Sequence, residues 1–227
     1  MSIKDDVVFT EELYSSPVTR VRRGIYKNSY PIIVKNTAQD IPDERLVGQY
    51  ETSFLAQNKV DHPAVNGVIE HVLDGAGCAL LLEDIGGKTL DSWIAQTLAD
   101  NVRWPLEVPE LFHLYLLRLL RWSISLAEGI AAFHQKGVIH NDINPVNIIV
   151  NAKNDQLQII DFGAAFIDDS NISDWSVVEH HKTLTYISPE QTGRLNRNID
   201  YRSDYYAFGA TLYQLFSGHP PFIAKDL

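Results

Sequence analysis

Apolar and polar residues alternate over short runs in the first ninety positions of the chain. A period of two is typical of β-strands with one buried face, and the turn-forming residues between the runs indicate short connections. The pattern predicts strands at residues 7–14, 18–26, 30–37, 65–74 and 77–84. The N-terminal part of the chain is therefore expected to be mostly β-sheet.

One helix is expected to interrupt these strands, at residues 42–58. The segment begins with Pro42 and acidic residues, which are favoured at helix N-termini. Its spacing predicts that Leu46, Tyr50 and Leu55 lie on roughly one side of the helix. The N-terminal part is thus expected to contain a single helix.

The period changes to that of an α-helix after the Gly86-Gly87 pair. A helix is indicated around residues 90–98, and a longer one from Pro109 to Gln135, with Gly137 as a C-terminal cap. The apolar residues that recur at helical spacing in the longer helix include Leu116, Leu119, Leu120, Ile124 and Ala131.

The last third of the chain contains a hairpin pattern and one more helix. Residues 137–163 alternate between turn and strand, and residues 204–217 are helical in pattern and almost entirely apolar. Such a helix is expected to be buried on most of its sides. A mostly β part followed by a mostly helical part predicts two lobes with a cleft between them.

Composition and charge narrow the class of protein. The 227 residues, 45% of them hydrophobic, allow one domain with a substantial core. The net charge of -10 argues against a nucleic-acid partner. The one cysteine, Cys78, excludes an intrachain disulfide and points to a reducing, cytoplasmic location. The N-terminus lacks a signal pattern, and the most apolar stretch, residues 111–120, is half the roughly 20 needed to cross a bilayer. No membrane association is expected.

Residues 140–163 hold a group of polar side chains with suggestive spacing. The run begins His140-Asn141-Asp142, continues to Asn147, and reaches Asp161-Phe162-Gly163 19 residues after Asp142. Two acids and one amide offer hard oxygen atoms, which suit a hard cation. The alternative is a pair of unrelated loops whose carboxylates serve as caps.

This run resembles the H-R-D-x-x-x-x-N and D-F-G motifs of protein kinases. The resemblance implies that Asp142 orients the attacking hydroxyl and accepts its proton, while Asn147 and Asp161 hold the magnesium ions at the phosphates of ATP. Asn144 stands where kinases usually have a lysine at the γ-phosphate, and Asn141 replaces an arginine that usually pairs with a phosphorylated activation loop. An amide at position 144 can still donate a hydrogen bond.

The same resemblance assigns residues on the nucleotide side. Lys35 matches the strand lysine that contacts the α and β phosphates, and Glu51 is expected to be its ion-pair partner, with Glu44 as the runner-up. In the connector between the lobes, Leu82 would be the gatekeeper beside adenine, and backbone groups of Glu83 and Ile85 would pair with the base.

The glycine-rich loop is where the chain departs from the family. Alignment with the kinase pattern G-x-G-x-x-G-x-V puts Tyr14, Ser16 and Thr19 at the three glycine positions and keeps only Val21. Glycines let backbone amides approach the phosphates closely, so their loss is expected to weaken ATP binding or to move the loop away. The hydroxyls of Ser16 and Thr19 would compensate in part.

The last third adds further family features. Ser188-Pro189-Glu190 resembles the end of a kinase activation segment, Thr183 favours serine or threonine substrates, and Asp204 would bind backbone amides of the catalytic loop. The combination is similar to the N-terminal kinase domains of large bacterial signalling proteins, in which an AAA-type ATPase, a GAF sensor and a histidine-kinase module follow. Further domains are expected on that basis.

The resemblance implies an α+β, two-lobed protein-kinase-like fold. Residues 1–85 would form a β-rich N-lobe with one helix, and residues 86–227 a helical C-lobe that lacks its last helices. Glu190 would then lack the arginine with which it pairs in the family. Apolar surface, including part of the helix at 204–217, would be exposed.

Three functions are compatible with these residues. The first is ATP- and Mg²⁺-dependent phosphoryl transfer to serine or threonine of a protein substrate. A catalytically weak pseudokinase or nucleotide-binding regulatory module is the alternative, because of Asn141, Asn144 and the missing glycines. A small-molecule kinase is the third, since such enzymes share the His-x-Asp and Asn pattern. Ser188-Pro189-Glu190 and Asp204 argue against this third function.

Overall fold

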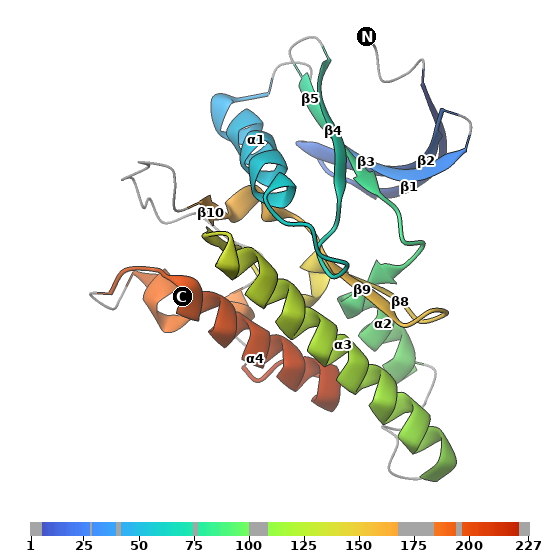
Figure 1. The fold of residues 1–227 in the computed structure, drawn as a ribbon, viewed down its shortest axis with the longest axis vertical. Helices are drawn as coiled ribbons and strands as arrows, with labels where there is room; N and C mark the ends of the chain where they lie inside the picture. The colour runs from blue at the N-terminus through green and yellow to red at the C-terminus, as the bar shows by residue number, and fades with distance from the viewer. Residues whose placement is uncertain are drawn as a thin grey trace.

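The computed structural model describes residues 6–27, 29–39, 42–74, 77–99, 109–167, 184–193 and 197–222, with the side chains at 74 and 109–112 excepted. The strands of the first half lie together at one end of the molecule, and the long helices lie at the other (Figure 1). The fold is α+β with two lobes, as predicted. Among the described residues, no helix combines the length and apolarity that a membrane span requires.

The N-lobe is built on one antiparallel sheet of five strands in the order β1-β2-β3-β5-β4. Alternation along β5 divides its apolar side chains between two small cores. Leu80 and Leu82 pack with Tyr50 on the side of α1, whereas Ala79 and Leu81 face the opposite core. The strands are β1 (Val7–Ser15), β2 (Thr19–Tyr26), β3 (Tyr30–Thr37), β4 (Val68–Asp74) and β5 (Gly77–Glu83).

The helix of the N-lobe, α1 (Glu44–Asn58), begins where the sequence predicts it. The side chain of Asp43 caps it by accepting a hydrogen bond from the N–H of Leu46 at 2.7 Å. Tyr50 is buried against the sheet, but Leu55 is 48% exposed. At about 100° per residue, Leu55 lies roughly opposite Leu46, so the prediction that the two share a side is wrong.

The C-lobe surrounds one large apolar core that is shared by its helices and short strands. Two small sheets, β6-β8-β9 and β10-β7, lie between the helices and the N-lobe. The helices are α2 (Leu90–Ala99), α3 (Pro109–Gln135) and α4 (Tyr201–Ser217). The strands are β6 (Lys88–Thr89), β7 (Val138–Ile139), β8 (Ile148–Asn151), β9 (Gln156–Ile159) and β10 (Phe166–Ile167). The 3₁₀ turns are η2 (Pro145–Asn147), η3 (Phe162–Ala164), η4 (Leu184–Tyr186) and η5 (Pro189–Thr192).

Helix α3 has two apolar faces, and the sequence pattern mixed them. The buried face consists of Leu119, Trp122, Leu126, Ile130 and Phe133. Leu120, Ile124 and Ala131, which we grouped with Leu119, are exposed instead. These three residues lie roughly 100° or more around the helix from the core face, so periodicity alone could not tell the two faces apart.

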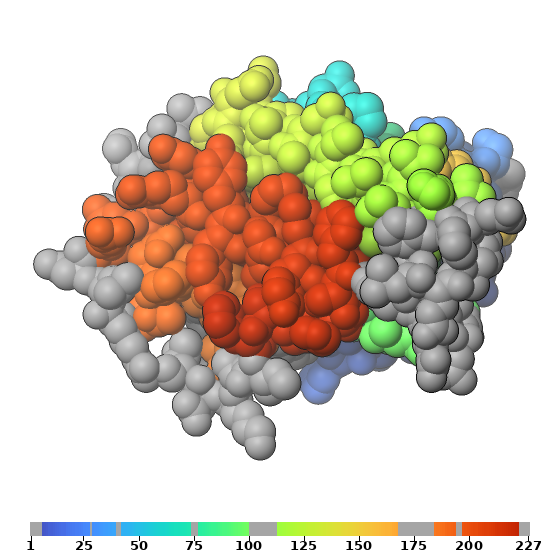
Figure 2. All heavy atoms as spheres, turned by 90° about the horizontal axis from the view of Figure 1, so that it is seen from below, coloured from blue at the N-terminus to red at the C-terminus, as the bar shows by residue number. Residues whose placement is uncertain are grey.

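Helix α4 lies beside α3 with one face open, which corrects the prediction that it is buried on most sides. Asp204, Ala207 and Thr211 are buried, but Tyr205 and Tyr213 are exposed. Figure 2 shows α4 and α3 side by side on the lower surface of the molecule. The exposure predicted for part of this helix is therefore confirmed.

Two alanine substitutions on α3 should distinguish its buried face from its exposed face by their effect on stability. Leu126→Ala is expected to lower the free energy of unfolding by about 2–5 kcal/mol, because it leaves a cavity in the core. Ile124→Ala is expected to lower it by less than about 1 kcal/mol, because Ile124 is 57% exposed. Urea denaturation of the two variants measures both changes. Equal losses would contradict the assignment of the faces.

Candidate active site

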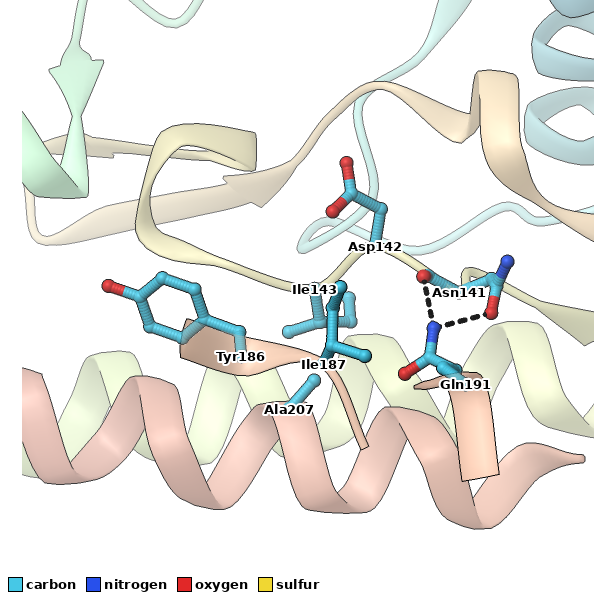
Figure 3. Close-up of a pocket in the computed structure, with 7 residues that line it drawn as sticks. All are labelled: Asn141, Asp142, Ile143, Tyr186, Ile187, Gln191 and Ala207. Atoms are coloured by element: carbon cyan, nitrogen blue, oxygen red, sulfur yellow. Dashed lines mark hydrogen bonds between the residues drawn. The ribbon is translucent and has the colours of Figure 1, made fainter. Parts of the chain in front are cut away.

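Asp142 lies in the loop between β7 and β8, and two side-chain amides hold its carboxylate. The Nδ2 of Asn144 donates to Oδ1 at 2.9 Å, and the Nδ2 of Asn147 donates to Oδ2 at 2.8 Å. Figure 3 shows the Asp142 side chain directed away from α4. Because each oxygen has its own donor, the plane of the carboxylate is set by the loop itself.

Asn144 uses both ends of its side chain inside this loop. Its Oδ1 accepts hydrogen bonds from the N–H groups of Val146 at 2.9 Å and Asn147 at 3.2 Å, which caps the turn η2. Its Nδ2 is engaged by Asp142, and the residue is only 1% exposed. The structure thus gives Asn144 a contact with Asp142, while the contact with a phosphate stays a prediction.

The backbone of the loop is anchored from α4 by Asp204. Its carboxylate accepts the N–H of His140 at 2.9 Å and the N–H of Asn141 at 2.8 Å, and it lies 2.8 Å from Nε2 of His134. The predicted contact of Asp204 with the amides of this loop is confirmed. Asp204 is fully buried, so these donors replace the water that a carboxylate requires.

His140 is buried behind the loop and has one consistent tautomer. Its Nδ1 accepts the N–H of Asp142 at 3.3 Å, which leaves Nε2 to donate to the carbonyl of Ile160 at 3.1 Å. Its ring packs against Phe162, with 4.5 Å between the centroids. His140 therefore joins the loop of Asp142 to the segment that carries Asp161.

Asp161 meets Lys35 across the two lobes. The Nζ of Lys35 lies 2.7 Å from Oδ1 of Asp161, although the residues are 126 positions apart. Asp161 has a left-handed backbone with φ of 64°, and its Oδ1 also accepts the N–H of Gly163 at 3.4 Å. Burial acts to raise the pKa of Asp161, but the charge and hydrogen bond of Lys35 outweigh it, and the pKa is lowered.

Glu51 does not contact Lys35, which corrects the predicted ion pair. The residue of α1 that faces Lys35 is Tyr50, whose ring centroid lies 5.6 Å from the Nζ. Glu51 is the next residue along, about 100° around the helix, and its side chain is exposed. Glu44, the runner-up, is also exposed in the first turn. Asp161 is thus the acidic partner of Lys35.

Asn147 and Asp161 carry side-chain oxygens of the kind that a hard cation prefers. The side chain of Asp161 is 39% exposed and ionised at neutral pH, and the side-chain oxygen of Asn147 accepts no hydrogen bond from the described residues. The N–H of Ile160 binds the carbonyl of Asn147 at 2.9 Å, so the two segments run together. No cluster of three or more His, Cys, Asp or Glu occurs within the described residues. One carboxylate and one amide suit Mg²⁺, which usually keeps waters and substrate phosphates as its other ligands.

The connector after β5 has most of its polar backbone groups engaged. The N–H of Glu83 donates to the carbonyl of Gly67 at 3.0 Å, and its carbonyl accepts Nδ2 of Asn66 at 2.9 Å. The carbonyl of Ile85 accepts Nδ2 of Asn151 at 2.7 Å. Among the described residues, none accepts from the N–H of Ile85. Leu82 is buried beside them. The N–H of Ile85 is therefore the group best placed to pair with a base.

Asn66 belongs to a buried polar network that sequence reasoning missed. Its N–H donates to the carbonyl of Ile159 at 3.0 Å, and its Nδ2 also donates to Oε1 of Gln158 at 2.8 Å. The carbonyl of Asn66 accepts Nε2 of Gln57 at 3.0 Å. The network joins α1, the connector and β9. The signal in the sequence is the presence of amide side chains, Gln57 and Gln158, inside segments with buried apolar neighbours.

Ser16 closes the turn between β1 and β2, where the family has glycines. Its Oγ accepts the N–H of Thr19 at 3.0 Å and of Val18 at 3.4 Å, and donates to the carbonyl of Thr19 at 3.2 Å. Val21 follows on β2, where it is paired in register with Lys35. The hydroxyl of Ser16 is thus engaged within its own turn.

Glu190 finds a partner within the described residues. Its Oε1 accepts a hydrogen bond from the hydroxyl of Ser203 at 2.8 Å. Burial acts to raise the pKa of Glu190, but hydrogen bonds from the backbone and from Ser203 hold it below its ordinary value. Thr183, on which the expected preference for serine or threonine rests, lies outside the described residues.

Replacing Lys35 by methionine should change how the free energy of unfolding depends on pH. In the wild type the pKa of Asp161 is lowered on folding, so this pair stabilises the fold above about pH 4 and less as the pH falls. In Lys35→Met, both contributions of Lys35 that lower the pKa of Asp161 are lost, and burial is opposed only by His140 and the N–H of Gly163. The variant should lose about 1 kcal/mol at pH 7, since solvent screens the pair, and the loss should shrink toward pH 3.

Urea denaturation of both proteins between pH 3 and pH 7 measures the difference. Lys88→Met is the matched control, because Lys88 is an exposed lysine whose partner is the neutral Gln96. A loss in Lys35→Met that does not vary with pH would contradict the coupling between Lys35 and Asp161.

Comparison with known protein families found a match to most of this chain. The family model described as the protein kinase domain matches residues 18–226. The chain is 34% identical to the serine/threonine-protein kinase pkn2 of Myxococcus xanthus over 169 residues, 72% of this chain and 18% of that protein. It is 30% identical to pkn3 of the same organism over 190 residues, 80% of this chain and 32% of that protein.

A third relative covers more of the chain. The probable serine/threonine-protein kinase SCO3848 of Streptomyces coelicolor is 28% identical over 221 residues, 95% of this chain and 29% of that protein. The chain thus spans less than a third of the length of these relatives. The family match begins at residue 18, so Tyr14 and Ser16, at two of the glycine positions, lie outside it.

Proposed function

The chain belongs to the protein kinase domain family, and on that premise we propose that it transfers the γ-phosphoryl group of ATP to serine or threonine side chains of proteins. The observation that carries the proposal is the convergence of Asp142, Asn147, Asp161 and Lys35 on one site from both lobes. Asp142 is bonded to Asn147 and Lys35 is bonded to Asp161, which gives the site a defined geometry.

Asp142 is the group that faces the nucleophile. Asn144 and Asn147 each donate to one of its carboxylate oxygens, so its orientation is set before a substrate arrives. The substrate hydroxyl donates to this carboxylate. Asp142 takes its proton as the hydroxyl oxygen bonds to the γ-phosphorus and the bond from that phosphorus to the departing ADP breaks. The loop needs little rearrangement during the reaction, because Asp204 and His140 hold its backbone.

Lys35, Asp161 and Asn147 are the residues that hold the nucleotide and its cation. Bound Mg²⁺ would neutralise charge on the phosphates and orient them. Asp161 and the side-chain oxygen of Asn147 supply oxygen ligands, and Lys35 supplies a positive charge between the lobes. Leu82 and the N–H of Ile85 would receive the adenine, with the backbone of Glu83 beside them.

The substrate and setting follow from the relatives and the sequence together. The three relatives named above are serine/threonine-protein kinases by name, which supports a protein substrate rather than a small molecule. Their greater length supports further domains in the parent of this chain. The buried free thiol of Cys78 supports a reducing, cytoplasmic location.

Labelled ATP tests the proposal. The protein is incubated with Mg²⁺ and ATP labelled at the γ-phosphorus, with mixed protein substrates and, separately, with small alcohols and amino sugars. Label on serine or threonine of a protein is expected. Label on the small molecules alone would overturn the proposal in favour of a small-molecule kinase, and no label on either would overturn it as well.

A second candidate is a nucleotide-binding regulatory module without turnover. The turn closed by Ser16 favours it, because this turn carries no glycines and the hydroxyl of Ser16 is engaged within the turn. Titration with Mg²⁺ and ATP in a thermal-shift experiment identifies it, since stabilisation follows ligand occupancy. Saturable stabilisation together with absence of transfer would establish this candidate over the first.

A further inference from the structure

Gln191, in the turn η5, is hydrogen-bonded to the loop of Asp142, which lies far from it in the sequence. Its Nε2 donates to the backbone carbonyl of Asn141 at 2.9 Å and to Oδ1 of Asn141 at 2.7 Å (Figure 3). The two residues are 50 positions apart. One side-chain amide thus binds both acceptors of the residue that precedes Asp142.

The other end of Gln191 is fixed within its own turn. Its Oε1 accepts hydrogen bonds from the N–H and from the Oγ of Ser188, both at 2.9 Å, and Ser188 is fully buried. These bonds form a capping box at the start of η5. Since both ends of the amide are held, Gln191 has one orientation, and η5 and the loop move as a unit.

Asn141 needs such support because its backbone is unusual. It has a left-handed conformation with φ of 66°, which is costly for a residue other than glycine, although asparagine tolerates it best. Asp204 binds its N–H from one side, and Gln191 binds its carbonyl from the other. The peptide that leads into Asp142 is therefore held from two directions.

Among the described residues, Asn141 is bound by Asp204, by Gln191 and, through its Nδ2 at 3.4 Å, by the carbonyl of Ala164. Its backbone and its side chain are therefore both held in place.

We propose that Gln191 is a positioning residue, which fixes the loop of Asp142 through Asn141 and thereby raises the rate of phosphoryl transfer. The proposal rests on the proposed function for its kinetic effect. Its structural part, the order of residues 140–147, holds whether or not the chain turns over. The two parts are therefore measured separately.

Hydrogen exchange tests the structural part without any activity. In Gln191→Ala, the amides of residues 140–147 should exchange about 10-fold faster or more than in the wild type, while those of the N-lobe sheet do not change. Gln156→Ala is the matched control, because Gln156 is an exposed glutamine at the start of β9. Unchanged exchange in Gln191→Ala would overturn the proposal even in an inactive protein.

Kinetics test the catalytic part in a protein that transfers phosphate. Gln191→Ala should lower kcat about 10- to 100-fold and leave KM for ATP within a factor of about two, since Lys35 and Asp161 are untouched. Asn141→Asp should lose less of kcat than Asn141→Leu, because its carboxylate still accepts from Gln191 and only the longer bond to the carbonyl of Ala164 is lost. Gln191→Ala combined with Asn141→Leu should lower kcat by less than the product of the two single effects, since both changes remove the bond between the side chains.

The kinetic test has a clear negative outcome. A Gln191→Ala variant with the kcat of the wild type would overturn the proposal. A rise in KM for ATP without a change in kcat would also contradict it.

Discussion

Replacing Asp142 by alanine is expected to lower phosphoryl transfer by about 10²- to 10⁴-fold, the range typical of a general acid or base. The variant loses the carboxylate that accepts the proton of the substrate hydroxyl. Lys35 and Asp161 keep their contact of 2.7 Å, so binding of Mg²⁺ and ATP should change little. Initial rates with labelled ATP measure the first effect, and thermal-shift titration measures the second.

Asp91→Ala is the matched control for this experiment, because Asp91 is an exposed carboxylate on α2. It should keep the rate of the wild type. A second variant, Asp142→Asn, keeps the shape of the side chain but cannot accept the proton, and it should lose nearly as much activity as Asp142→Ala. Activity of Asp142→Asn close to that of the wild type would contradict the role of Asp142.

Replacing Asp204 by alanine is expected to give a large loss of stability. The N–H groups of His140 and Asn141 would be left without an acceptor in a buried site, and His134 would lose its partner. Unpaired buried donors cost about 1–3 kcal/mol each, so the two N–H groups alone imply a loss of about 2–6 kcal/mol. Urea denaturation at pH 7 measures it.

Asp200→Ala provides a comparison on the same helix. Asp200 caps α4 by accepting the N–H of Arg202 at 2.9 Å and is partly exposed, so its loss should cost about 1 kcal/mol. Asp204→Asn should fall between the two, since its oxygen can accept only part of the bonds. If Asp204→Ala cost no more than Asp200→Ala, the loop of Asp142 would not depend on this anchor.

The sequence was sufficient where a position depends on close spacing along the chain. Asp142 and Asn147 are five positions apart, so their place in one loop was predictable, whereas the hydrogen bond between their side chains was not predicted. The strands and helices were also predictable, because their periods are local. The contact of Asp204 with the same loop was predicted from the family resemblance, which adds long-range information that a single pattern lacks.

The partners that sequence could not provide are distant and polar. Lys35 meets Asp161 rather than Glu51, because the phase of α1 turns Tyr50 inward, and one residue of phase is below the resolution of a helical pattern. Asn66 and Gln158 are 92 positions apart, and Gln191 lies 50 positions from Asn141. Amides such as these have no distinctive spacing, since they bind whatever acceptor the fold brings to them.

Asn66 also takes part in the hydrogen bonds that join part of the N-lobe to the C-lobe. The segment before β4 is bonded to β9 through Ile159, both at the carbonyl of Ala64 and at the N–H of Asn66. It is bonded to α1 through Gln57. Helix α1 and the end of β5 are thus tethered to the C-lobe, whereas β1, β2 and β3 have fewer such ties. The part of the molecule that unfolds cooperatively is therefore expected to include α1 and the end of β5 together with the C-lobe. Relative motion of the lobes should be a motion of the first three strands against the rest of the molecule.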